Sequence, residues 1–78
     1  MSEQLREIAA SNEPWAAQRA QNALEICEAV NAGEMTADEA QELMRDLVRM
    51  DRLDSESSDM RLKAALVSAV YIAANLPI

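Results

Sequence analysis

The stretch AALVSAVYIAA, Ala64–Ala74, decides the fold of this 78-residue chain. Ser68 is its only polar residue, so a helix formed here is apolar nearly all the way round. A surface helix of a globular protein has one apolar stripe, whereas a helix of this kind has to be buried on several sides. The stretch is also much shorter than the roughly 20 apolar residues that a membrane span needs. It predicts either the central helix of a small bundle or a surface covered by another protein or by copies of this chain.

The composition around this stretch is typical of an all-α protein. Half of the residues are apolar, yet the chain has no Phe, one Trp, one Tyr and one Gly. Its common residues, including Ala, Leu, Met, Glu, Gln and Arg, are strong helix formers. A chain of this length forms one domain, residues 1–78, and buries only about 60% of its unfolded surface. We therefore expect a small helical bundle whose marginal core is completed by self-association.

The first part of the chain predicts a short helix followed by a long one. The short helix covers Glu3–Ala10, and the long one covers about Glu13–Asn31. Ser11 or Asn12 is suited to cap the long helix, and Pro14 fits its first turn because no backbone N–H is needed there. A single helix kinked at Pro14 is the alternative.

Two sequence signals separate the second helix from the third. Gly33 is suited to the left-handed residue that follows a helix. Thr36-Ala-Asp-Glu39 matches a capping box, in which the Thr and Glu side chains each bond the other's backbone N–H. The apolar residues of the third helix recur three and four positions apart, which predicts a buried stripe: Ala40, Leu43, Leu47 and Met50, with Met44 and Val48 extending the same face.

The fourth helix contains the apolar stretch. It is expected to begin after a cap at Asp54 or Ser55, with Ser58 as a later option. It then runs to about Asn75, and Pro77 marks its end. Together these segments predict an all-α bundle of three main helices plus a short N-terminal one.

The charge excludes some classes of partner. The chain has 14 acidic and 7 basic residues, a net charge of −7. Binding to nucleic acid or to an anionic membrane depends on clustered Lys and Arg, so neither is expected. The acidity keeps a hydrophobic small protein soluble, or it forms a docking surface for a basic partner. The second reading defines an alternative function: a small acidic inhibitor or regulator that blocks a nucleic-acid-binding site on a host protein.

The residues needed for chemistry are missing or isolated. There is no histidine, so neither a Cys–His nor a Ser–His pair can form. Cys27 is the only cysteine and Gly33 the only glycine, which argues against a zinc site and a phosphate-binding loop. We therefore predict no catalytic, cofactor-binding or metal-binding residue, no small-molecule substrate, and no enzyme activity. The unpaired cysteine and the absence of an N-terminal signal segment favour the cytoplasm.

The predicted functional residues form a protein interface instead. Small residues in the fourth helix would let another helix approach closely, while the larger apolar residues would fill the contact. The third helix supports this surface with part of its own apolar stripe. The predicted interface residues are Leu66, Val67, Val70, Tyr71 and Ile72, with Leu43, Leu47 and Met50 from the third helix.

Residues 31–47, NAGEMTADEAQELMRDL, carry a resemblance together with the segments DLVRMD (46–51) and LKAALV (62–67). Over about residues 31–75 the chain resembles short acidic helical proteins encoded by tailed bacteriophages. The resemblance implies a virion component, an assembly factor or a small inhibitor of host machinery, found in the host cytoplasm or the virion. It assigns no functional residue. With the features above, it leads us to expect a non-enzymatic, homo-oligomeric structural or assembly protein.

Overall fold

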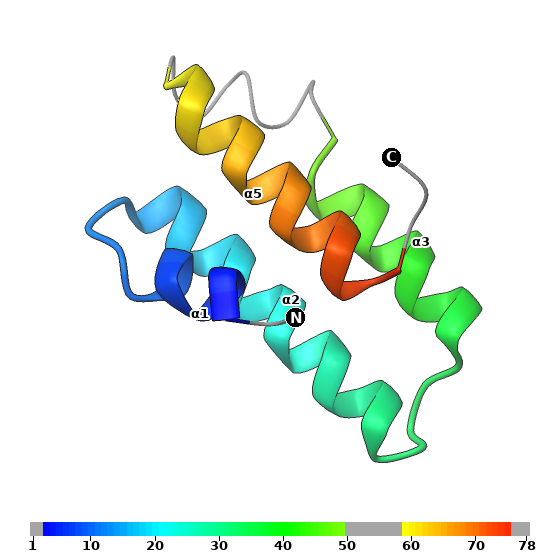
Figure 1. Cartoon of the computed structure of the whole chain (residues 1–78). Coiled ribbons are helices and arrows are strands. Elements are labelled where there is room, and N and C mark those ends of the chain that lie inside the picture. The colour runs from blue at the N-terminus through cyan, green and yellow to red at the C-terminus, as the bar shows by residue number, and fades with distance from the viewer. Residues whose placement is uncertain (1–2, 50–58, 76–78) are drawn as a thin grey trace.

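The computed structural model describes residues 3–49 and 59–75, and this part of the chain forms four helices and no strand. The helices are α1 (Glu3–Ala9), α2 (Pro14–Asn31), α3 (Ala37–Leu47) and α5 (Met60–Ala73) (Figure 1). The predicted all-α fold, with three main helices and a short N-terminal one, is confirmed.

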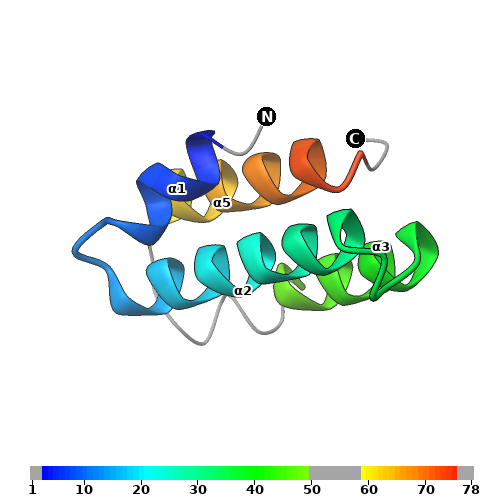
Figure 2. The same ribbon diagram turned by 90° about the horizontal axis from the view of Figure 1, so that it is seen from below.

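The helices are arranged in two layers. Figure 2 shows α1 and α5 in one layer and α2 and α3 in the other. In Figure 1, α2 and α5 run in the same direction and α3 runs in the opposite one. The two layers enclose the core, so each helix turns only one side inward.

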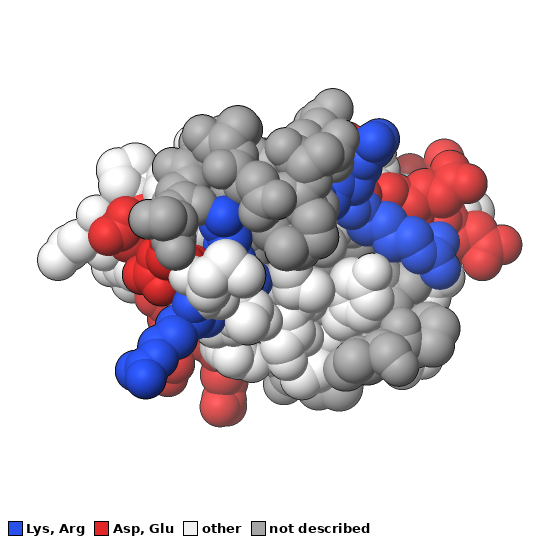
Figure 3. Space-filling model, turned by 90° about the horizontal axis from the view of Figure 1, so that it is seen from above, with Lys and Arg blue, Asp and Glu red and all other residues white. Residues whose placement is uncertain are grey.

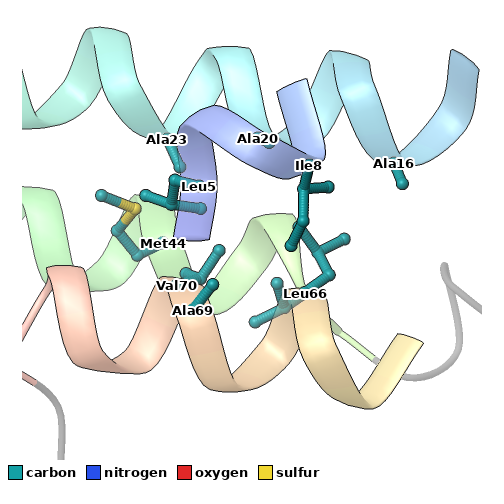
Figure 4. Packing of buried hydrophobic residues seen from close by; sticks show 10 residues of the cluster. Leu5, Ile8, Ala16, Ala20, Ala23, Met44, Leu66, Ala69 and Val70 are labelled. Atoms are coloured by element: carbon teal, nitrogen blue, oxygen red, sulfur yellow. The ribbon is translucent and has the colours of Figure 1, made fainter. Parts of the chain in front are cut away.

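The core combines small side chains on α2 with larger ones on the other three helices. Short alanine side chains let neighbouring helices approach closely, and the larger side chains fill the space between them. Burying one Leu or Val contributes about 1.5–3 kcal/mol. Figure 4 shows this cluster, which includes Leu5, Ile8, Ala16, Ala20, Ala23, Met44, Leu66, Ala69 and Val70.

The chain turns sharply between α1 and α2. The Ser11 hydroxyl donates a hydrogen bond of 2.7 Å to the carbonyl of Ile8, which closes the end of α1. Pro14 begins α2, so two separate helices form and the alternative of one kinked helix is wrong. The expected cap is also wrong: Glu13 holds the N-cap position of α2, and no side chain caps the helix there. Proline removes one free N–H from the first turn, which lessens the need for a side-chain cap.

The end of α2 is a Schellman motif. Gly33 has a φ of 75°, as its position in the sequence predicts. Its N–H donates to the carbonyl of Val30 at 3.0 Å, and the N–H of Glu34 donates to the carbonyl of Ala29 at 2.9 Å. These two bonds satisfy carbonyls that the helix itself leaves free.

The capping box at the start of α3 is confirmed. The Glu39 N–H donates to the Thr36 hydroxyl oxygen at 3.1 Å, and the Thr36 N–H donates to the Glu39 carboxylate at 3.2 Å. The Thr36 hydroxyl also donates to that carboxylate at 2.9 Å. The backbone bond from Thr36, followed by the hydroxyl bond, lowers the pKa of Glu39 from its usual 4.5, because both bonds favour the charged form.

The last helix begins later than expected. Its N-cap is Asp59, whose carboxylate accepts a hydrogen bond of 3.0 Å from the N–H of Leu62. The caps expected from the sequence lie outside the described residues: Asp54, Ser55 and Ser58. At its other end, α5 stops at Ala73, two residues before the expected Asn75.

Two side chains tie the helices together through backbone carbonyls. The Arg19 guanidinium donates to the carbonyl of Leu47 at 3.2 Å and to that of Trp15 at 3.3 Å, joining α2 to the end of α3. The Gln41 amide donates to the carbonyl of Ala74 at 3.2 Å, joining α3 to the end of α5. The bonds to Leu47 and Ala74 fix the position of α3 against its neighbours.

The capping box predicts a pH-dependent effect of Thr36→Ala. At neutral pH the substitution should lower the free energy of unfolding by about 1 kcal/mol, whereas Thr36→Ser should keep most of the cap. A lowered folded pKa means that the contribution of Glu39 is present above pH 4.5 and is lost as pH falls through that lowered pKa. Urea unfolding at neutral and acid pH checks this. Equal losses at both pH values would contradict the role of the Glu39 carboxylate.

Candidate functional site

The candidate site lies on α5, whose two sides differ sharply. One side is buried against the other helices and consists of Lys63, Leu66, Ala69 and Val70. These positions are three, three and one residue apart, so they lie on one face of the helix. The apolar sequence continues round to the opposite side, which the other three described helices leave open.

We call this opposite side the outer face of α5. Met60 is 62% exposed and Ile72 is 41% exposed, which is high for large apolar side chains. Ala64 is also exposed, and Ala65, Val67 and Tyr71 on the same side are half-buried. The outer face consists of Met60, Arg61, Ala64, Ala65, Val67, Ser68, Tyr71 and Ile72.

Charge is nearly absent from the outer face. No acidic residue follows Asp59 in a chain that has 14 of them. Of the two basic residues in α5, Lys63 is only 3% exposed, which leaves Arg61 as the charged side chain on the outer face. On the side of the molecule drawn in Figure 3, the described surface in the lower middle of the view is uncharged, and charged side chains lie toward its two ends.

The structure divides the interface residues predicted on this helix into two groups. Leu66 and Val70 are completely buried in the core of a single chain, so a partner could reach them only if the core opened. Val67 and Tyr71 are half-buried and Ile72 is exposed, and all three belong to the outer face. A sequence that is apolar all round does not show which side a helix turns inward.

The interface residues predicted on α3 also differ from one another in their exposure. Leu43, predicted within the buried stripe of this helix, is 46% exposed, because α3 turns Ala40 and Met44 inward instead. Leu47 is partly buried and packs against the core. Met50 lies outside the described residues. Leu43 is therefore the described member of this group that offers apolar surface to a partner.

A separate pocket of about 290 Å³ opens where α2, α3 and the end of α5 meet. No charged residue lines it. Cys27 faces this pocket, and burial, followed by the nearby charge of Glu28, raises the pKa of its thiol from the usual 9.0. The thiol therefore stays protonated near neutral pH and is a poor nucleophile. The lining residues are Ile26, Cys27, Val30, Asn31, Ala37, Ala40, Met44, Ala73 and Ala74.

Two carboxylates of α3 pair with residues at the two ends of the helix. Glu39 belongs to the capping box, and the Asp46 carboxylate lies 3.8 Å from the Arg49 guanidinium. Within residues 3–49 and 59–75, no three His, Cys, Asp or Glu side chains are grouped so that they could hold a metal ion. Asp38, Glu39 and Glu42 are exposed and Asp46 is half-buried, so these carboxylates form a largely solvent-exposed face of α3.

Sequence reasoning missed three features of this region. The burial of Lys63 carries no local signal, because lysine on a helix is ordinarily exposed. The pocket depends on how three helices end against one another, which no local pattern describes. Arg61 could have been found, because it follows the last acidic residue and precedes the apolar stretch.

Comparison with known proteins identifies no relative: no family model, curated protein or solved structure matches the chain. None of the described helices is long and apolar enough to cross a membrane.

The two sides of α5 predict opposite effects for the same substitution. Val70→Asp places a carboxylate in the core and should destabilise the chain by more than ~4 kcal/mol, enough to unfold it. Ile72→Asp places it on the outer face and should leave the helical content of the chain intact. Circular dichroism during thermal melting distinguishes the two variants. Equal melting temperatures would contradict the assigned orientation of α5.

Proposed function

We propose that this chain is a non-enzymatic protein–protein interaction module that assembles with copies of itself, as structural and assembly proteins do. The observation that supports the proposal most directly is the outer face of α5. It combines exposed Met60 and Ile72 with a helix that carries no acidic residue. Met60 and Ile72 lie at opposite ends of this helix, and the face between them carries apolar and small side chains, which favours contact with another protein.

The size of the core supports the same proposal. Eleven apolar residues are buried in the described part of the chain, and five of them are alanines: Ala16, Ala20, Ala23, Ala40 and Ala69. Alanine buries little area, so such a core contributes less than one built from larger residues. An association that favours the folded chain adds stability through mass action. Self-association therefore offsets the weakness of a small, alanine-rich core.

The distribution of charge favours contact through α5. Two copies of a chain with a net charge of −7 repel each other at long range. This repulsion is smallest where no acidic residue lies, and α5 provides such a surface. The alternative of an acidic inhibitor relies on free carboxylates, and the pairing of Glu39 with Thr36 and of Asp46 with Arg49 gives it less support.

Light scattering coupled to size exclusion, over a range of protein concentrations, tests the proposal. We expect a mass above that of one chain at high concentration, and a melting temperature that rises with concentration. Added salt should preserve or strengthen the association, because it screens the repulsion between acidic chains. Ile72→Asp should shift the protein toward the monomer without loss of helix, while Glu25→Asp, an exposed change on α2, should have no effect. A monomer at every concentration and salt level would contradict the proposal.

A further inference from the structure

We infer that the outer face of α5 pairs with the same face of a second copy, with the two helices antiparallel and related by a two-fold axis at Ser68. This inference rests on the proposed self-association and assigns its geometry. Symmetric dimers of this kind use the same patch on both subunits, so the patch has to be complementary to itself. Three features of α5 meet that requirement.

The first feature is the alternation of small and large side chains. An antiparallel pair centred on Ser68 places Ala64 opposite the partner's Ile72, along the row of residues four apart that contains Ser68. The exposed Ile72 thus fills the space above a short side chain instead of meeting another large one. In a parallel pair, Ile72 would face the partner's Ile72, and Ala64 would face the partner's Ala64 across a gap.

The second feature is the position of the one charge on the outer face. Arg61 lies in the first turn of α5 and is exposed. In the antiparallel pair it lies opposite the partner's Asn75, beyond the carboxyl end of the partner helix. That end carries a partial negative charge, which attracts a cation. In a parallel pair, Arg61 would face the partner's Arg61 and repel it.

The third feature is the small residue at the axis itself. Ser68 is half-buried on the outer face and lies four residues from both Ala64 and Ile72. A short side chain at the crossing point lets two helices approach closely. Its hydroxyl can hydrogen-bond to the partner's Ser68, which leaves no polar group unsatisfied at the centre of the contact.

Cysteine crosslinking tests this geometry, in a background where Cys27→Ala removes the native thiol. Three single variants are prepared: Ser68→Cys, Ala64→Cys and Ile72→Cys. Each is oxidised with copper phenanthroline, and covalent dimer is measured on a non-reducing gel. Circular dichroism confirms that each variant keeps the helical content of the parent. A disulfide requires the two Cα atoms to lie within about 7 Å, so the reaction reports which residues face each other.

The antiparallel pair predicts a distinctive pattern. Ser68→Cys should become a covalent dimer alone, because residue 68 lies on the axis. Ala64→Cys and Ile72→Cys should each remain monomeric on the gel when oxidised alone, and should crosslink when mixed. Covalent dimers from Ala64→Cys alone and from Ile72→Cys alone would show a parallel pair and overturn the inference.

Two further outcomes separate this inference from the proposed function. If light scattering shows a dimer and none of the three variants crosslinks, another surface forms the contact; the inference then fails and the proposed self-association stands. If light scattering shows a monomer at every concentration, the proposed self-association fails, and the inferred geometry fails with it.

Discussion

The packing of one side of α5 against the rest of the chain is the interaction on which the structure depends. Leu66 and Val70 are completely buried, and the side chains around them come from α1, α2 and α3 (Figure 4). Three alanines on the inner side of α2 make this possible, because they let neighbouring helices approach closely. Without the contribution of α5, the remaining helices would leave their inward sides exposed to water.

The same packing creates the surface that we propose for assembly. A helix that is apolar nearly all round can turn only one side toward a two-layer core, and the chain has no further described helix to cover the other side (Figure 2). The outer face of α5 is therefore a consequence of a short chain with one unusually apolar helix. The acidic residues that oppose association elsewhere on the chain are absent from this helix.

Sequence reasoning succeeded where a few residues act locally. Pro14, Gly33 and the capping box at Thr36 each fix the backbone within a turn, so the predicted helix boundaries agree with the structure to within one or two residues there. It placed the start of the last helix too early, because several Asp and Ser residues before Met60 are equally suited to be a cap. Only tertiary packing selects among such equivalent residues.

The same limit applies to the site. The sequence predicted the apolar helix as the interaction element, but it could not separate Leu66 and Val70 from Val67, Tyr71 and Ile72. Periodicity distinguishes two faces only when one of them is polar. The pocket beside Cys27 and the burial of Lys63 depend on contacts between helices far apart in the sequence, so no local pattern predicts them.

The most direct test of the central claim is an NMR dilution series of the isotope-labelled chain, which follows the amide chemical shifts residue by residue. We expect concentration-dependent shifts at Ala64, Ser68 and Ile72 on the outer face of α5. We also expect unchanged shifts on the exposed side of α2, for example at Gln21 and Glu25. Concentration-dependent shifts confined to other helices, or shifts that do not change on dilution, would contradict the claim that α5 is the assembly surface.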